Sequence, residues 1–409
     1  MEIREGYKQT EIGVIPEDWD CVELGDIGEC IIGLTYKPSD VKKYGRLVLR
    51  SSNINDNRLV YTDNVYVDAH IEDKLIVKEN DILICVRNGS RELIGKCAII
   101  DKKATKHTFG AFMSVFRSKF GPYLFNCFQS GIIKKQINAI LGATINQITN
   151  KDLKSFFIPF PKLPEQQAIA TALSDIDGLI NSLQKLIDKK KKIKQGAMQE
   201  LLTGKRRLEG FSGEWEERFV LEFGTITTGS TPSTLKREYW NGSITWVTPT
   251  DIGEQKYIAT SERQITESGL SVTRKLEPNT VLITCIASIG KNAILRKVGA
   301  CNQQINAITP TKDYNSDFLY YLFEIYKPYL LSKAGITATN IVSKSEFSLM
   351  CFKVPPTIEE QTAIANILSD MDSEIEALER KLNKYKDIKQ GMMQELLTGR
   401  IRLLEEAVP

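Results

Sequence analysis

Several turns of this sequence carry side chains that could form hydrogen bonds with the edges of nucleic-acid bases. Base reading needs Arg, Lys, Asn, Gln, Ser or Thr on loops that can enter a groove, and each good bidentate pair contributes about 1 to 3 kcal/mol of discrimination. In the N-terminal half the candidates are Thr35, Tyr36, Lys37, Arg87, Asn88, Ser90 and Arg91. In the C-terminal half they are Ser230, Thr231, Lys236, Arg237, Tyr239, Ser288, Lys291, Gln303 and Gln304. The alternative for each residue is an ordinary solvated turn.

No motif in the sequence predicts catalysis. The chain lacks the Asn-Pro-Pro-aromatic element of adenine methylation, and the Gly-Lys pairs at 95–96 and 290–291 do not fit a phosphate-binding Walker A loop. With only His70 and His107, a histidine metal site or a Ser-His-Asp triad is not expected. The eight cysteines form no CxxC pair and lie on or beside apolar segments, which is typical of buried free thiols in a reducing compartment. We therefore expect no catalytic residue, cofactor or metal.

Composition bounds the class of protein but leaves its partner open. A length of 409 residues suggests two or three domains, and 42% hydrophobic residues can fill real cores. The net charge of +3 is too small to argue for nucleic acid by itself. No apolar run approaches 18 residues, and the N-terminal stretch has no hydrophobic region of a secretory signal, so we expect a cytoplasmic protein without membrane contact.

The elements that must position these turns are organised by an internal repeat. The segment Glu165 to Leu208 returns at a constant offset of 195 residues as Glu360 to Leu403, with about 26 of 44 positions identical. Each copy predicts one long helix of about 38 residues, or roughly 57 Å at 1.5 Å per residue. Apolar residues at steps of four and three predict a coiled-coil seam. The seam residues of the second copy are Ile364, Leu368, Met371, Ile375, Leu378, Leu382 and Tyr385.

Both copies carry matching start and stop signals. The spacing of Thr357 and Glu360 can form a capping box, and Pro164 precedes the first copy. Gly204 and Gly399 stand where the chain must turn left-handed, and cations follow each of them beside the negative helix end.

Two features of the long helices have more than one interpretation. The lysine run Lys189 to Lys192 with Lys194 could be a solvated face, a phosphate contact or a docking face, and the first copy places Lys190 and Lys194 on the seam. Gly196 and Gly391 occupy the same repeat position, although an interior glycine costs about 1 kcal/mol relative to alanine. Either a partner backbone approaches there or the two helices cross tightly.

The regions between the helices are also related, though more faintly. In both halves a tryptophan and a glycine turn are followed by a buried-strand pattern, a polar turn and Gly-Lys leading into a second strand. We therefore expect an α+β fold with two pseudo-symmetric globular domains separated by two long antiparallel helices that form a coiled coil. The expected boundaries are 1–163, 164–208, 209–356 and 357–409. Trp240 and Trp246 should be core anchors rather than base-stacking platforms.

The combination of TGSTPSTLKREYWNGSITWVTPTDI (Thr228 to Ile252), the helix entry with its Glu-Gln and Leu-Ser-Asp elements, and the twice-used KQG-x-MQELLTG exit resembles the specificity subunit of type I restriction-modification enzymes. The resemblance covers essentially the whole chain, including the order of its parts: a recognition domain, a conserved helix, a second recognition domain and a second conserved helix. It implies a non-catalytic chain with two target-recognition domains for a bipartite DNA target, two short halves around a nonspecific gap.

The resemblance also implies partners. Two methyltransferase subunits would bind the conserved helices, and endonuclease/translocase subunits would complete the restriction enzyme. The candidate partner-binding residues are Gln195, Gly196, Met198, Leu202, Gln390, Gly391, Met393 and Leu397. The helix length would act as a ruler that allows half-sites up to roughly 16 base pairs apart. The rival interpretation is a coiled-coil interaction scaffold without sequence-specific DNA binding.

Overall fold

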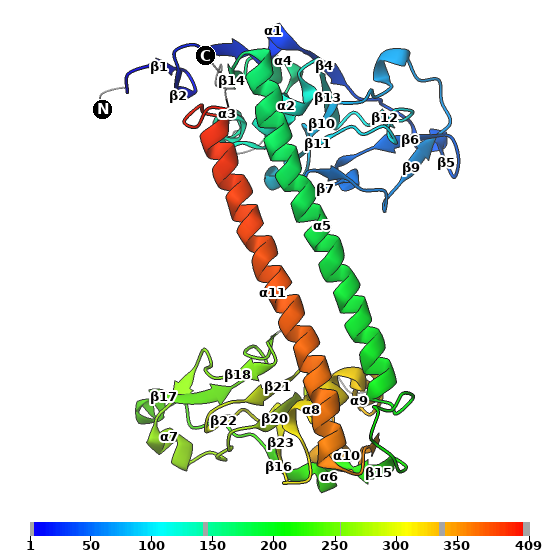
Figure 1. Ribbon diagram of the computed structural model, residues 1–409, viewed down its shortest axis with the longest axis vertical. Coiled ribbons are helices and arrows are strands. Elements are labelled where there is room, and N and C mark those ends of the chain that lie inside the picture. Colours follow the sequence, from blue (N-terminus) through cyan, green and yellow to red (C-terminus); the bar gives the residue numbers. More distant parts are fainter. Residues whose placement is uncertain (1–3, 142–145, 254, 335–339, 404–409) are drawn as a thin grey trace. The chain divides into compact units, whose positions relative to one another are not determined.

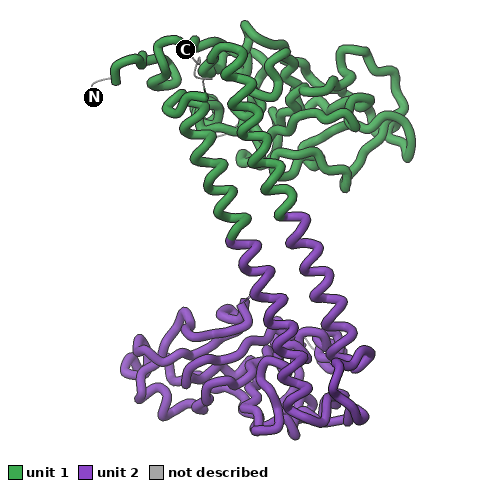
Figure 2. Tube along the Cα trace, viewed as in Figure 1, with its two compact units in different colours: residues 1–183, 381–409 green, residues 184–380 purple. Residues whose placement is uncertain are grey.

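The computed structural model describes residues 4–141, 146–253, 255–334 and 340–403 (Figure 1). The chain divides into two compact units (Figure 2). Unit 1 contains residues 1–183 and 381–409, and unit 2 contains residues 184–380. Each unit therefore combines one globular region with a stretch of both long helices. The four domain boundaries expected from the sequence stay a prediction.

The described residues of unit 1 form two four-stranded sheets and three strand pairs. The first sheet has the order β11-β10-β13-β4, and the second has the order β12-β6-β9-β5. The first contains β4 (Glu29–Ile32), β10 (Ile82–Cys85), β11 (Cys97–Ile99) and β13 (Met113–Arg117). The second contains β5 (Val41–Lys42), β6 (Arg46–Leu49), β9 (Val65–Val67) and β12 (Thr108–Phe109). The pairs are β1 (Tyr7–Thr10) with β2 (Gly13–Pro16), β3 (Asp20–Glu23) with β14 (Phe157–Phe160), and β7 (Ile54–Asn55) with β8 (Arg58–Leu59).

The described residues of unit 2 form a five-stranded sheet, a three-stranded sheet and one strand pair. The five-stranded order is β16-β23-β20-β21-β18, and the three-stranded order is β19-β17-β22. The larger sheet contains β16 (Gly224–Thr228), β18 (Tyr257–Ile258), β20 (Thr280–Thr284), β21 (Asn292–Leu295) and β23 (Ile305–Pro310). The others are β17 (Trp240–Val247), β19 (Gln264–Ile265) and β22 (Gly299–Cys301), with β15 (Glu216–Phe219) paired to β24 (Cys351–Val354).

The two globular regions share one topology. The order β11-β10-β13-β4 in unit 1 matches β21-β20-β23-β16 in unit 2, and both runs are antiparallel. The central strands β10 and β20 are buried along their whole length. Asn80 and Asn279, which precede them, both adopt a left-handed backbone with φ of 68° and 66°. The faint sequence similarity between the halves therefore reflects a duplicated fold.

Helices complete both units. In unit 1 they are α1 (Leu24–Ile27), α2 (Gly121–Gln129), α3 (Gly131–Ile140) and α4 (Asn150–Lys154). In unit 2 they are α6 (Val220–Phe223), α7 (Glu267–Ser271), α8 (Ser316–Ile325), α9 (Lys327–Ser332) and α10 (Lys344–Ser348). The long helices are α5 (Leu163–Leu201) and α11 (Ile358–Leu396), each of 39 residues. Within each unit, residues late in one long helix or just after it contact residues in the first half of the other, so the helices run antiparallel.

The apolar ends of the long helices belong to the cores of the units. In unit 1, Ile169 and Leu173 of α5 and Leu396 of α11 join one core. In unit 2, Leu201 of α5 and Leu368 of α11 join the corresponding core. The seam residues predicted from the sequence are buried or half-buried. Helix packing therefore depends on the same residues as the folding of each globular region.

Ser130 separates α2 from α3 and caps α3, because its hydroxyl accepts a hydrogen bond from the backbone N of Ile132. The capping box expected at the start of the second long helix needs correction. Only half of the capping box at α11 forms, since the backbone N of Glu360 contacts the hydroxyl of Thr357 at 3.4 Å while the Glu360 carboxylate binds elsewhere. Gly204 and Gly399 adopt the predicted left-handed conformation, with φ of 70° and 68°. Residues 404–409, at the end of the segment expected at 357–409, lie outside the described residues.

The eight cysteines are free thiols, as expected from the sequence, and six of them are buried. Burial raises the pKa of Cys97, Cys127 and Cys301 to about 12, which keeps these thiols protonated. Among the described residues, no helix is long and apolar enough to cross a membrane.

Candidate functional site

The first predicted turn of unit 1 approaches a neighbouring loop very closely. A Cβ atom added to Gly33 would lie 2.1 Å from the carbonyl oxygen of Gly110, so only glycine permits this approach. Thr35 and Lys37, which follow, are exposed, and Tyr36 is half-buried. The turn at 35–37 thus lies beside the loop that contains Gly110.

The second predicted turn of unit 1 meets the same loop. The backbone N of Arg87 donates to the carbonyl oxygen of Phe112 at 3.1 Å, and the guanidinium carbon lies 5.1 Å from the Phe112 ring centroid. Phe112 is 58% exposed. The structure therefore brings the turns at 35–37 and 87–91 together around residues 109–112. Sequence reasoning did not single out Phe112, because an apolar side chain in a turn gives no motif.

Not every candidate in the 87–91 turn is available to a ligand. The Asn88 amide donates to the Ser51 hydroxyl at 3.2 Å and accepts from the backbone N of Ser90 at 3.0 Å. Arg91 donates to the carbonyl oxygen of Leu141 at 3.1 Å. These two side chains hold the turn in place, so Arg87 and Ser90 are the better candidates for an external contact.

The equivalent surface in unit 2 is built in the same way. A Cβ atom on Gly229 would lie 2.1 Å from the carbonyl oxygen of Asn302, which again requires glycine. The hydroxyl of Thr231 donates to the Gln303 amide oxygen at 2.6 Å, and both residues are exposed. The structure thus joins two candidates that are 72 residues apart in the sequence.

The two tryptophans are buried, as expected, and they support this turn. The indole N of Trp246 donates to the carbonyl oxygen of Ser230 at 3.0 Å, and that of Trp240 donates to Ser233 at 3.1 Å. Their rings pack edge to face with centroids 5.0 Å apart. The guanidinium carbon of Arg263 lies 3.8 Å from the Trp240 centroid, a contact that no motif predicts. This aromatic pair fixes the backbone of residues 230–233.

Lys236 and Arg237 extend the same loop with exposed cations. The Tyr239 hydroxyl lies 3.2 Å from the Lys236 ammonium, and this hydrogen bond raises the Lys236 pKa. Leu235 beside them is 93% exposed. The loop therefore presents positive charge to solvent at the edge of unit 2.

The other candidates in unit 2 are mostly used internally. Lys291 donates to the carbonyl oxygen of Pro249 at 3.3 Å, and the Gln304 amide oxygen accepts from Asn302 at 2.9 Å. Ser288 is exposed. Lys291 and Gln304 consequently position neighbouring loops, whereas Ser288 is open to solvent.

The candidate partner-binding residues differ in accessibility. Gln195 and Gln390 are exposed, while Met198 and Met393 are half-buried against the cores of their units. The predicted contact is corrected for Leu202 and Leu397. Both side chains are 0% exposed and fill the cores, because each lies on the inward face at a helix end.

Gly196 and Gly391 do not mark a tight crossing of the helices. A Cβ atom at either position would meet no heavy atom within 4 Å among the described residues. The space beside both glycines is therefore open, which overturns one of the two interpretations. A close approach by a partner remains the proposal for this repeat position.

The lysine run of α5 makes contacts within the chain. Its partners are carboxylates of α11, so neither solvation nor an external ligand accounts for the whole run. The ion pairs are Lys190 with Glu374 at 2.6 Å, Lys191 with Glu379 at 2.7 Å, and Lys194 with Asp372. Cations on the expected seam are thus matched by acids on the facing helix.

The internal repeat reproduces one of these ion pairs. Lys389 and Asp177 are the repeat counterparts of Lys194 and Asp372, and they form a pair at 2.8 Å in unit 1. In unit 1, Arg58 also donates to the carbonyl oxygen of Asp177 at 3.0 Å. A cation from the globular region therefore reaches the long helix beside this pair.

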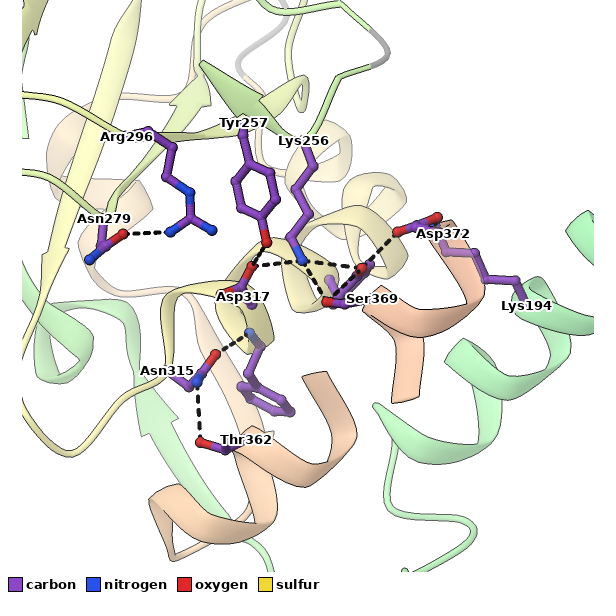
Figure 3. Close-up of polar contacts among 12 residues, drawn as sticks. Lys194, Lys256, Tyr257, Asn279, Arg296, Asn315, Asp317, Thr362, Ser369 and Asp372 are labelled. Carbon is purple, nitrogen blue, oxygen red and sulfur yellow. Dashed lines mark hydrogen bonds and ion pairs between the residues drawn. The ribbon is translucent and has the colours of Figure 1, made fainter. Parts of the chain in front are cut away.

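In unit 2, a larger network of polar contacts connects the globular region to the long helices (Figure 3). The ammonium of Lys256, just before β18, lies 2.7 Å from Asp317 and 2.9 Å from the Ser369 hydroxyl of α11. Tyr321 donates to Asp372 at 2.6 Å. Burial lowers the Lys256 pKa, although Asp317 opposes this effect. The network fixes the globular region of unit 2 against its segment of the helix pair.

The chain is similar to known proteins over almost its whole length. It matches the family described as "Type I restriction modification DNA specificity domain" over residues 16–195 and 212–386. It is similar to the putative type I restriction enzyme MjaX specificity subunit of Methanocaldococcus jannaschii, with 31% identity over 98% of this chain and 97% of that protein. It is also 29% identical to the EcoR124I/EcoR124II specificity subunit of Escherichia coli, over 59% of this chain and 64% of that protein.

Two solved structures share the fold. A chain of a type I R-M system, from a study of its complex assembly and conformational transition, gives a TM-score of 0.61 at 17% identity and covers 95% of this chain and 99% of that chain. The S subunit of the type I restriction-modification system of M. genitalium gives a TM-score of 0.60 at 15% identity. This match covers 97% of this chain and 98% of that chain.

Proposed function

Because this chain belongs to the family of type I restriction-modification DNA specificity proteins, we propose that each of its units reads one half of a bipartite DNA target. The chain is the specificity subunit and is not itself an enzyme. The proposed readers are the exposed side chains around residues 109–112 in unit 1 and around Gln303 in unit 2.

One observation carries this proposal. The two units share one scaffold, with a glycine packed so closely on a neighbouring carbonyl that an added Cβ atom would lie 2.1 Å from its oxygen in each, yet the side chains on the adjoining turns differ. Arg87 and Phe112 occupy this surface in unit 1, whereas Thr231 and Gln303 occupy it in unit 2. A duplicated frame with different donors suits two different half-sites, since each base edge demands its own donors and acceptors.

The long helices have a second role in the proposal. They would dock two methyltransferase subunits near Gln195 and Gln390, where the neighbouring glycines leave open space. Their 39 residues, about 58 Å of helix, would limit the gap between the half-sites. Endonuclease/translocase subunits would join this assembly, and a cytoplasmic location with access to DNA belongs to the same proposal.

Mapping of methylated adenines tests this function. DNA is exposed to the chain together with its methyltransferase subunit, and the methyltransferase alone is the control. We expect a split motif with a fixed gap that is absent from the control. Methylation independent of the chain, or a short continuous motif, would refute the two-domain reading and favour an interaction scaffold without sequence-specific DNA binding.

A further inference from the structure

A positively charged groove lies beside the last turns of α11 in unit 1. Its volume is about 1160 Å³, and it is bordered by the β1–β2 hairpin, the start of α3 and the end of α11. Among the described residues, six cationic side chains line it, against the single carboxylate of Glu11. The cations are Arg4, Lys134, Lys135, Lys386, Lys389 and Arg400.

Most of this charge is not neutralised by the described residues of unit 1. Lys389 pairs with Asp177 at 2.8 Å, and Arg400 lies 3.5 Å from Glu395. Lys134, Lys135 and Lys386 are exposed and make no ion pair with the described residues. The repeat counterpart of Lys386 is Lys191, which is paired with Glu379, whereas the counterpart of Glu379 is the uncharged Gln184. An anionic ligand would relieve the mutual repulsion of these lysines.

The repeat-related groove in unit 2 has a different character. It is smaller, about 430 Å³, and it is lined by Gln195, Met198 and Gln199, which correspond to Gln390, Met393 and Gln394 of the larger groove. In the part of the chain that the structure describes, its charged lining residues are Lys327 and Glu324. Both grooves are therefore lined by the same glutamines and methionine of the repeat. Of the two, the groove of unit 1 has an excess of positive charge among its described lining residues.

We propose that the groove of unit 1 binds an acidic segment of a methyltransferase subunit, and that the groove of unit 2 binds its methyltransferase without this electrostatic contribution. The inference rests on the docking role proposed above. The shared glutamines and methionines would supply the common part of both interfaces. Charge complementarity would make docking at unit 1 tighter at low salt and more sensitive to salt than docking at unit 2.

A protein segment suits the groove of unit 1 better than DNA does. Its lining combines the cations with apolar side chains such as Ile12, Val14 and Met393, which a phosphate backbone would not use. None of the turns proposed to read bases contributes to it. The groove is thus separate from the proposed DNA-reading surface of the same unit.

The test measures binding of the methyltransferase subunit to the full chain at increasing salt by native mass spectrometry and sedimentation. Leu331→Glu places a charge in the groove of unit 2, so the remaining binding reports on unit 1. The triple variant Lys134→Gln/Lys135→Gln/Lys386→Gln removes the charge from unit 1. Its matched control is Lys102→Gln/Lys103→Gln/Lys106→Gln, which changes three exposed lysines of the same unit away from the groove.

We expect wild-type chain to lose one methyltransferase subunit before the other as salt rises. The groove variant should weaken docking at unit 1 about tenfold at low salt, and the control should leave it unchanged. Equal salt dependence at both units, or unchanged binding by the groove variant, would overturn the inference. The inference would also be overturned if the groove variant lost DNA binding but kept methyltransferase docking, because the groove would then bind DNA phosphates. If wild-type chain binds no methyltransferase at all, the docking part of the proposed function fails instead.

Discussion

Arg402 holds the carboxylate of Glu165, 237 residues away, through two parallel hydrogen bonds of 2.7 Å from Nε and 2.8 Å from Nη2. Arg207 holds Glu360 in the same way, at 2.6 Å and 2.7 Å. A tryptophan indole also donates to each of these carboxylates. Within each unit, the cation that follows the end of one long helix thus pairs with the acid at the start of the other.

Removal of Arg207 should destabilise unit 2 strongly. The Glu360 side chain is 1% exposed, so Arg207→Ala would leave a buried carboxylate without its counter-ion, at a cost of about 3 kcal/mol. Arg206→Ala is the matched control, because its pair with Glu200 is more than half exposed on both sides and should change stability by less than about 0.5 kcal/mol. Urea unfolding followed by tryptophan fluorescence measures both. Equal effects of the two substitutions would contradict this account.

Gly196→Ala and Gly391→Ala should stabilise the free chain. Open space beside both glycines accepts a methyl group, and alanine is the better helix former by about 1 kcal/mol per site. If a methyltransferase backbone approaches there, the same substitutions should weaken its docking. Thermal unfolding and methyltransferase binding are measured together on each variant. Higher stability with unchanged binding would remove these glycines from the interface.

The stability of unit 1 should decrease in mild acid because of His107. Burial, reinforced by the charge of Arg46, lowers the His107 pKa below its ordinary value of 6.5. The unfolded chain then binds this proton more readily than the folded chain does. The stability that His107 contributes is complete above pH 6.5 and is lost as the pH falls through the depressed folded pKa.

Urea unfolding at pH 7.5 and 5.5 tests this dependence on pH. His107→Gln should lose less stability between the two pH values than the wild-type chain. His70→Gln changes an exposed histidine and should keep the wild-type dependence. An unchanged pH dependence in His107→Gln would show that other groups cause it.

Substitutions on the two reading surfaces should affect different halves of the DNA target. Arg87→Ala should reduce discrimination at one half-site, and Arg237→Ala at the other, each by about 5- to 150-fold if the lost contact is bidentate. Arg91→Ala is a useful contrast, since its contact with Leu141 predicts loosening of the whole turn rather than loss at one base. The discrimination at each half-site is measured by mapping the methylated DNA motif of each variant. Changes in both half-sites from one substitution would argue against separate reading.

The internal repeat allowed most of the architecture to be predicted. Identity between the two copies is high in the helices, where the same apolar seam and the same glycine-terminated ends recur. The seam also explains why Lys190 and Lys194 had to meet something other than an apolar partner. The apolar periodicity of the sequence could not show that Glu374 and Asp372 face these two lysines, because it describes one helix at a time.

The reading surfaces were only partly predictable. Thr231 and Gln303 were both candidates, but their contact depends on strands that bring residues 72 positions apart to one edge. Asn88, Arg91, Lys291 and Gln304 have the right chemistry, yet their side chains bond to neighbouring loops. Side-chain type therefore identifies what could bind, whereas burial and internal hydrogen bonds decide which groups are available.

The sequence by itself determined the duplication, the two long helices, the buried state of the tryptophans and the resemblance to a specificity subunit, because these follow from spacing and residue type along the chain. Only the tertiary structure decided that the cations after Gly204 and Gly399 bind Glu360 and Glu165, that Gly196 and Gly391 border open space, and that the two repeat-related grooves differ in charge. Those properties depend on distances between segments far apart in the chain, which packing sets and local sequence does not encode.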